Sequence, residues 1–224
     1  MPDGQASTAR SSTLRHSPPA LPLVPPRRHD PRRDGMTSMS MPRSMWTVDS
    51  RTIVYAAIGA ALYGVLVGLF KIPVPGTTAV DARPAFALVP FFGFAFGPVV
   101  GLFTGLVGNM IGDQISGWGA LTSYNWSIAN GVVGLLAGLA PAYLGSMMSG
   151  SLGRRAAAGA VGGAIAVVIG FLVVFSDMIK DQMDFNAVLT TEYIPVVIGD
   201  LIVTIILVPV LVYAWEPVKE RLGR

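Results

Sequence analysis

Polar and aromatic side chains gather between two apolar stretches of this 224-residue sequence. Asn109 and Asp113 are four residues apart at the end of one glycine-rich stretch, and Trp126 and Asn130 repeat that spacing at the start of the next. Residues four apart lie on the same face of a helix. Amides and carboxylates offer directional hydrogen bonds, and an indole ring offers a flat apolar surface. The pattern therefore predicts a small-molecule pocket built by two neighbouring helices.

Three further residues are candidates for the same pocket. Tyr124 comes shortly before the second pair, and Arg83 is a cation that could balance Asp113. Asp200 interrupts the apolar run VVIGDLIVTII. A carboxylate at the centre of a membrane helix costs about 2.5–3.5 kcal/mol on insertion scales. We therefore expect Asp200 to face protein or a wet cavity as a wall of the pocket.

Each of these residues also has a purely structural explanation. Tyr124 and Trp126 fit an aromatic belt at a membrane surface. Asn109 and Asn130 fit hydrogen bonds between helices, and Asp113 fits an ordinary helix end. Their gathering on one side of the membrane is what favours a binding site.

The composition indicates a membrane protein. Hydrophobic residues make up 52% of the chain and charged residues 13%, whereas soluble domains carry about 25% charged residues. The sequence has no cysteine, and its two histidines, His16 and His29, both precede the apolar part. We therefore expect no thiolate or histidine metal site and no cofactor. Much of the basic charge lies in the first fifty residues, so it is not evidence for nucleic-acid binding.

The apolar stretches predict an all-α membrane protein with six transmembrane helices. A membrane-spanning helix needs about 20 predominantly apolar residues. The segment GFAFGP, at Gly93–Pro98, should break the second span from the third, because the residue before a proline is disfavoured in a helix. The expected spans are Thr52–Phe70, Ala82–Phe96, Pro98–Gly112, Trp126–Met147, Ala156–Phe175 and Tyr193–Trp215.

Lysine and arginine residues predict the orientation, because short cytoplasmic loops are enriched in them. Arg154 and Arg155 lie between the fourth and fifth spans, and further basic residues precede the first span and follow the sixth. With six spans, all of these fall on one side, so both termini should be cytoplasmic and the polar cluster should face outward.

Three regions follow from this organisation. Residues 1–50 form a basic tail rich in Pro, Ser and Arg that we expect to be disordered. A start at Met36, Met39, Met41 or Met45 would remove most of that tail. Residues 51–218 should form the six-helix membrane domain, and residues 219–224 a short cytoplasmic tail.

Small residues recur every four positions in the first span. Ala56, Ala60, Gly64 and Gly68 form one helical stripe, and small residues let another backbone approach closely. This stripe is either a contact inside the protein or a docking surface for a partner.

The sequence resembles the substrate-binding S components of energy-coupling factor (ECF) vitamin transporters, and the riboflavin-type or uncharacterised subgroup most of all. The stretches AAIGAALYGVLVGLFKIPVPGT, FGPVVGLFTGLVGNMIGD and WSIANGVVGLLAG carry the resemblance, which covers roughly residues 51–215. The resemblance implies a six-helix subunit of the cell membrane. It would capture a water-soluble vitamin or precursor from outside and deliver it through a membrane coupling subunit driven by two separate ATPases.

The resemblance also implies roles for two segments. Family members dock the coupling subunit through an A-x-x-x-A motif on the first helix, which Ala56 and Ala60 match, with Gly64 one turn further and Ala57 and Ala61 as a second register. The first outer loop, Ile72–Arg83, would act as a lid over the pocket. The aromatic and amide side chains suit a planar heterocycle such as a flavin or a pyrimidine.

Two other functions are compatible with parts of the sequence. The segment DMIKDQMD could belong to an intramembrane enzyme acting on an isoprenoid or lipid substrate, but a second Asp-rich motif is absent and a solvated acidic loop explains it better. A stand-alone small-molecule transporter is the other alternative, although the sequence has no obvious inverted repeat. The sequence also has no Walker A motif, so ATP hydrolysis would belong to partners.

Overall fold

The computed structural model describes residues 45–74 and 81–221. They all lie in one compact unit, Arg43–Arg224. Most of the expected N-terminal tail, the centre of the expected lid loop and the last three residues lie outside the described residues.

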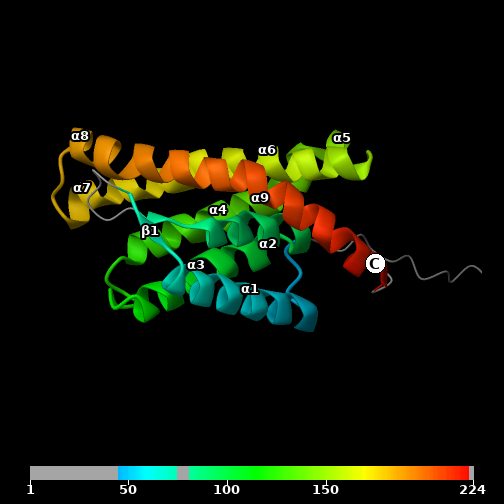
Figure 1. Cartoon of the computed structure of the whole chain (residues 1–224), viewed down its shortest axis with the longest axis horizontal. Helices are drawn as coiled ribbons and strands as arrows, with labels where there is room; N and C mark the ends of the chain where they lie inside the picture. Colours follow the sequence, from blue (N-terminus) through cyan, green and yellow to red (C-terminus); the bar gives the residue numbers. More distant parts are fainter. Residues whose placement is uncertain (1–44, 75–80, 222–224) are drawn as a thin grey trace, which may run out of the picture. The chain divides into compact units, whose positions relative to one another are not determined.

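The described part is almost entirely helical (Figure 1). Its elements are α1 (Ser50–Leu69), β1 (Ile72–Pro73), β2 (Asp81–Ala82), η1 (Pro84–Ala87), α2 (Leu88–Phe96), α3 (Pro98–Ile115), α4 (Tyr124–Tyr143), α5 (Gly145–Met148), α6 (Leu152–Gly170), η2 (Phe171–Ser176), α7 (Asp177–Lys180), α8 (Phe185–Ala187), η3 (Val188–Tyr193) and α9 (Ile194–Arg221). The two short strands pair antiparallel, with Ile72 opposite Ala82 and Pro73 opposite Asp81.

The chain is a helical membrane protein. Among the described residues, four helical runs are long and apolar enough to cross a membrane, and a fifth is apolar but shorter. The four are Ser50–Leu69, Tyr124–Tyr143, Leu152–Lys180 and Phe185–Arg221, and the shorter one is Pro84–Phe96. Helix α3 is not among them, because it ends in polar residues that include Asn109 and Asp113.

The last two runs are longer than the predicted spans. Helix α6 continues through the 3₁₀ turns of η2 into α7, so the run extends past Phe175 to Lys180. The final run includes the π-helical segment η3 and continues to Arg221, so α9 reaches into the region predicted to be a tail.

The predicted break between the second and third helices is confirmed at Gly97. Helix α2 ends at Phe96 and α3 begins at Pro98. Gly97 has a φ of 106°, in the left-handed region that favours glycine, and Pro98 takes the first helical position, where its missing N–H costs nothing. The reversal brings Gly93 against Gly101, so α2 and α3 pack closely from the start.

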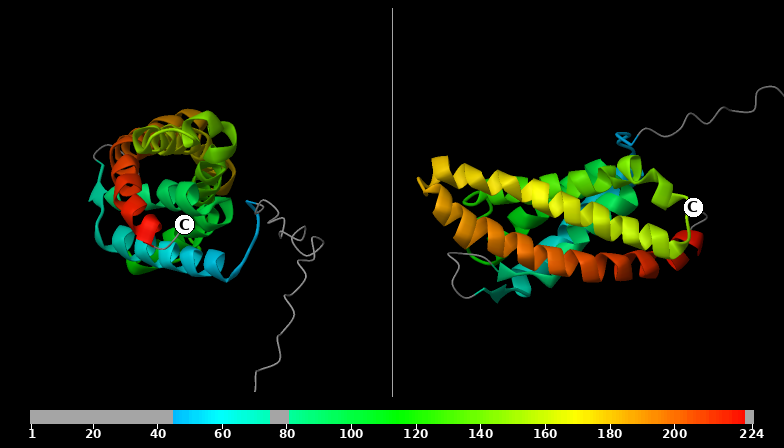
Figure 2. Two further views of the ribbon diagram at one scale, coloured as in Figure 1. Left: turned by 90° about the vertical axis from the view of Figure 1, so that its right-hand side faces the viewer. Right: turned by 90° about the horizontal axis from the view of Figure 1, so that it is seen from above.

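Helix α2 occupies the centre of the arrangement. It contacts α1, α3, α4, α6 and α9, and Val89, Pro90, Phe91, Phe92 and Gly93 are all buried. Around it, α1 packs on α3, α3 on α4, α4 on α6, and α6 on α9. The pairs α1–α3 and α6–α9 lie on opposite sides of α2 and α4 (Figures 1 and 2).

Candidate functional site

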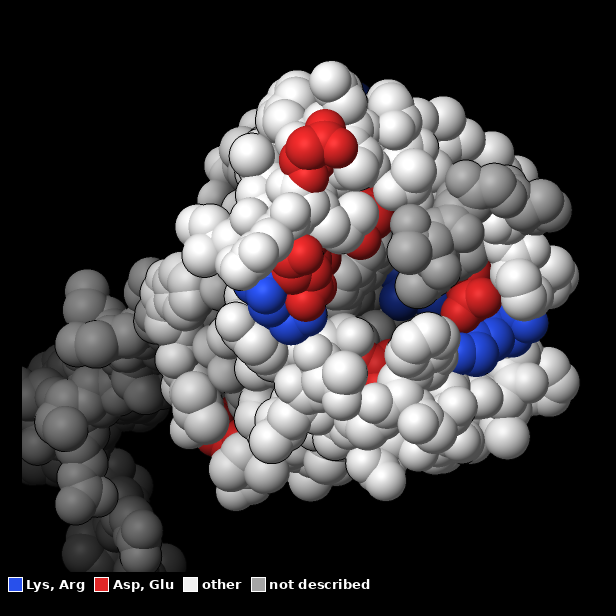
Figure 3. Space-filling model, turned by 90° about the vertical axis from the view of Figure 1, so that its left-hand side faces the viewer, with Lys and Arg blue, Asp and Glu red and all other residues white. Residues whose placement is uncertain are grey.

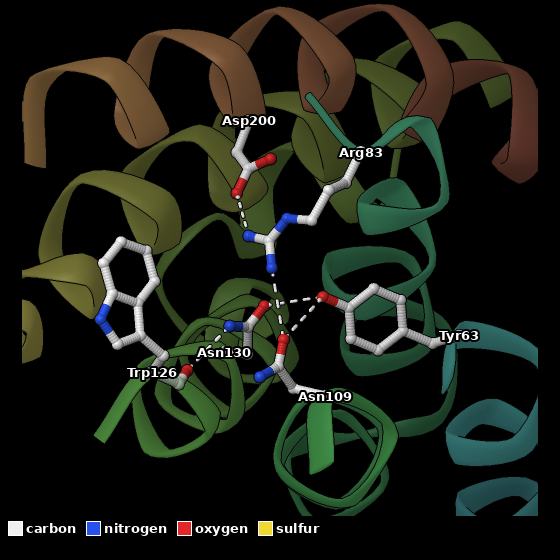
Figure 4. Close-up of polar contacts among 6 residues, drawn as sticks. All are labelled: Tyr63, Arg83, Asn109, Trp126, Asn130 and Asp200. Carbon is white, nitrogen blue, oxygen red and sulfur yellow. Dashed lines mark hydrogen bonds and ion pairs between the residues drawn. The ribbon is translucent and has the colours of Figure 1, made fainter. Parts of the chain in front are cut away.

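Two asparagines and a tyrosine from three helices meet inside the protein (Figure 4). The Tyr63 hydroxyl of α1 donates to Asn130 Oδ1 of α4 at 2.9 Å and lies 3.5 Å from Asn109 Oδ1 of α3. Asn130 donates in turn to the Trp126 carbonyl at 2.8 Å. The side chains of Tyr63, Asn109 and Asn130 are all buried. These hydrogen bonds therefore satisfy polar groups that would otherwise be costly to remove from water.

Arg83 joins this cluster to α9. Its guanidinium donates to Asp200 Oδ2 at 2.9 Å and to Asn109 Oδ1 at 3.2 Å. Arg83 is 9% exposed and Asp200 1%, and the guanidinium also lies 5.4 Å from the Phe86 ring centre. The counter-charge of Arg83 is therefore Asp200, rather than Asp113 as the sequence pattern suggested.

A cavity of about 330 Å³ opens beside this cluster, at the α7 end of the helices. Figure 3 views that end, where acidic and basic side chains surround a hollow. The volume falls in the usual range for small-molecule sites, about 300–1,000 Å³. The lining residues are Val67, Lys71, Asp81, Arg83, Asn109, Gly112, Asp113, Ser116, Trp118, Ser123, Trp126, Asp177, Lys180, Asp181, Met183, Glu192 and Val196.

Four of the seven predicted pocket residues line this cavity: Arg83, Asn109, Asp113 and Trp126. Asp113 accepts from Asn109 Nδ2 at 3.0 Å, and the same amide donates to the Ser127 hydroxyl at 3.1 Å.

The other three predicted residues lie elsewhere. Asn130 and Asp200 are buried beneath the cavity, where they hold Tyr63 and Arg83. Tyr124 is 49% exposed and is not part of the lining, which fits the alternative of a surface aromatic.

Asp177 is the main residue that sequence reasoning missed. The expectation of a solvated acidic loop fails for it, because its side chain is buried. Its carboxylate accepts from Trp126 Nε1 at 2.9 Å and from Asn125 Nδ2 at 2.8 Å. These bonds fix the orientation of the Trp126 indole beside the cavity. The indole and the amide face an acid that is 51 and 52 residues away in the chain, so the sequence holds no local signal of these contacts.

Lysine–carboxylate pairs lie at the edge of the cavity. Lys71 lies 3.3 Å from Asp81, next to the β1–β2 pairing. Lys180 lies 2.8 Å from Asp181 and 3.8 Å from Asp177. The hydrogen bond from the Lys180 ammonium lowers the pKa of Asp181. Within residues 45–74 and 81–221, no three His, Cys, Asp or Glu side chains are grouped as a metal site would require.

The small-residue stripe of α1 faces inward. Ala56 and Ala60 are 6% and 3% exposed, and a side chain on Gly64 would meet Ile111 and the Gly108 carbonyl of α3. Ala60 and Gly64 therefore let α1 approach α3 inside the protein, and Ala56 belongs to a buried cluster with Phe91 and Phe92 of α2. The second register, Ala57 and Ala61, is exposed.

Comparisons with known proteins point to one family. A family model described as ECF-type riboflavin transporter, S component, matches residues 47–216. A UPF0397 protein of Vibrio atlanticus is 39% identical over 93 residues, which are 41% of this chain and 49% of that protein. A UPF0397 protein of Aliivibrio fischeri is 38% identical over 95 residues, which are 42% and 50% of the two chains. The chain thus spans about half the length of the curated relatives it matches, and no solved structure matches it.

Proposed function

This chain belongs to the ECF-type riboflavin transporter S component family, and we propose that it captures a planar, water-soluble vitamin or vitamin precursor from outside the cell. The family consists of transporter subunits, so the intramembrane-enzyme alternative is set aside. In the proposed complex, a membrane coupling subunit and two ATPases complete the importer and release the ligand on the cytoplasmic side.

The observation that carries this proposal is the cavity above the buried cluster of Tyr63, Arg83, Asn109, Asn130 and Asp200. A ligand in the cavity would meet the Asn109 amide and the Asp113 carboxylate on one helix and the Trp126 indole on the next. An indole held by Asp177 is a fixed stacking surface, and rigid aromatic surfaces with few convergent polar groups are typical of small-molecule sites.

A binding measurement tests the proposal. Riboflavin, the ligand in the family's name, and any compound that co-purifies with the chain would be titrated by calorimetry in detergent. Losing a buried hydrogen-bond partner costs about 1–3 kcal/mol, so Asn109→Ala should weaken binding by roughly 5- to 150-fold. Trp126→Phe should keep part of the stacking, whereas Trp126→Ala should lose it.

Asn186→Ala is the matched control, because Asn186 is exposed and lies outside the cavity lining. Each variant is first shown to unfold in a single cooperative transition, so that a loss of binding is not mistaken for a loss of folding. Affinity that stays the same in Asn109→Ala and Trp126→Ala would move the binding site elsewhere.

We also propose that the chain crosses the membrane six times, with α3 as the third span, both termini cytoplasmic and the cavity facing outward. The native chain has no cysteine, so single cysteines can report sidedness. An impermeant thiol reagent added outside should label cysteine at Ser116 or Asn186, but not at Ser149 between α5 and α6. Labelling at Ser149 would overturn this topology.

The docking surface on α1 is then proposed at Ala57 and Ala61, the exposed register of the A-x-x-x-A pattern. Ala57→Trp or Ala61→Trp should block assembly with the coupling subunit and leave ligand binding by the isolated chain intact. Ala60→Trp should instead disrupt folding, since Ala60 is buried against neighbouring residues. Assembly that survives both surface variants would place docking on another helix.

A further inference from the structure

Glu192 is a buried residue, and one of its two carboxylate oxygens has no hydrogen-bond partner in the described structure. It lines the cavity and is 7% exposed. Its Oε2 atom is buried without any hydrogen-bond partner. A buried charge without a partner is strongly unfavourable, so this position makes sense when something that enters the cavity supplies the partner.

The backbone around Glu192 is also unusual. Glu192 belongs to η3, the π-helical segment Val188–Tyr193. Single π-turns are rare and occur frequently at functional sites. Here the π-helical segment carries a carboxylate whose side chain joins the cavity lining.

The charges around the cavity show which kind of partner is missing. Among the described residues, three cations line the cavity, and each already has a carboxylate: Lys71 with Asp81, Arg83 with Asp200, and Lys180 with Asp181 and Asp177. Two lining carboxylates, Glu192 and Asp113, have no cationic partner in the described residues. Among the side chains of residues 45–74 and 81–221, the Asp113 carboxylate accepts a hydrogen bond only from the neutral Asn109 amide.

We propose that the cavity is built for a heteroaromatic cation, whose positive charge is held by Glu192 while its ring lies against Trp126. This proposal rests on the proposed capture function and adds the charge of the ligand. Tryptophan is the aromatic residue that attracts cations most strongly, and Asp177 fixes the Trp126 indole through its Nε1. An anionic ligand would have to displace a carboxylate from Lys71, Arg83 or Lys180, whereas a cation enters without breaking any of these pairs.

The test compares two ligands and two variants of the full chain. Thiamin carries a permanent positive charge on an aromatic ring, and riboflavin is neutral. Thiamin should bind the wild-type chain more tightly than riboflavin does. Glu192→Gln keeps the shape and removes the charge, so it should weaken thiamin binding by about 10- to 100-fold, because hydrogen bonds to charged groups are the stronger class. Riboflavin affinity should change little.

Glu220→Gln is the matched control, because Glu220 is exposed near the other end of α9. It should leave the affinity for thiamin unchanged. Should Glu192→Gln fail to fold, the wild-type comparison of the two ligands decides by itself.

Three results would overturn the proposal. Riboflavin could bind the wild-type chain more tightly than thiamin, thiamin affinity could be unchanged in folded Glu192→Gln, or mass spectrometry could identify a neutral or anionic compound that co-purifies with the chain. All three leave the capture function standing. A chain that binds neither probe and retains no small molecule from cells would contradict the capture function as well.

Discussion

Helices α3 and α4 meet in two different ways along their length. Near Gly97 they meet backbone to backbone, since a side chain on Gly101 would overlap the Gly134 carbonyl and one on Gly105 would overlap the Asn130 carbonyl. One turn further along α3, they meet through side chains, as Asn109 donates to Ser127 at 3.1 Å. The glycine half of this contact, at Gly101, Gly105 and Gly134, therefore fixes the spacing of the two helices. The polar half, which begins at Asn109 and Ser127, uses that spacing to line the cavity.

The largest expected effect comes from leaving a charge unpaired in the polar half. Asp200→Ala removes the partner of the buried Arg83 guanidinium. Breaking a buried pair by removing one partner costs about 3–5 kcal/mol. We expect a clear drop in the unfolding midpoint in detergent, measured by scanning fluorimetry.

The double variant Arg83→Gln/Asp200→Asn removes both charges and should recover part of that loss. An unfolding midpoint for Asp200→Ala equal to that of the wild type would mean that this pair does not hold the polar half together.

A smaller loss is expected from crowding the glycine half. In Gly134→Ala the added methyl group would overlap the Gly101 carbonyl, and overpacking typically costs about 1–3 kcal/mol. Because α3 and α4 must separate, ligand affinity should fall together with the unfolding midpoint, although Gly134 is not in the cavity lining.

Gly199→Ala is the control for this prediction. Apart from its own helix backbone, no atom of the described residues lies within 4 Å of the position of its added carbon, so this substitution should not lower the unfolding midpoint. Equal behaviour of the two glycine variants would contradict the spacing role of Gly134.

The smallest effect is expected at the edge of the cavity. Lys71 and Asp81 pair at 3.3 Å with side chains that are 26% and 22% exposed. Partly exposed pairs contribute about 0–1 kcal/mol, so Lys71→Met should change the unfolding midpoint little. A loss as large as that of Asp200→Ala would show that the edge pair, and not only the buried cluster, determines stability at this end.

The sequence predicted the local features well. The break at Gly97 follows from a proline next to a glycine. The contact between the Asn109 and Asp113 side chains follows from their spacing of four residues on one helix. The family resemblance is confirmed by the match over residues 47–216. These features depend on neighbours in the chain, which the sequence shows directly.

Contacts between residues that are far apart in the chain could not be predicted from the sequence. Tyr63 meets amides that are 46 and 67 residues away, and in the sequence it is only a tyrosine in an apolar span. Spacing showed that Ala56 and Ala60 share one face of α1, but not whether α3 or a partner covers that face. Glu192 is another such feature, because only the fold shows that its Oε2 atom is buried without a hydrogen-bond partner among the described residues.

The backbone contacts at Gly93, Gly101 and Gly134 have a consequence for how this subunit moves. A contact between two side chains can be rearranged by rotating bonds, but a contact between two backbones has no such internal degrees of freedom. Helices α2, α3 and α4 should therefore shift as one block. Any rearrangement that accompanies delivery of a ligand would then be concentrated where side chains form the contact. These places are the packing of α6 on α9 and the Arg83 guanidinium, which contacts Asn109 of α3 and Asp200 of α9.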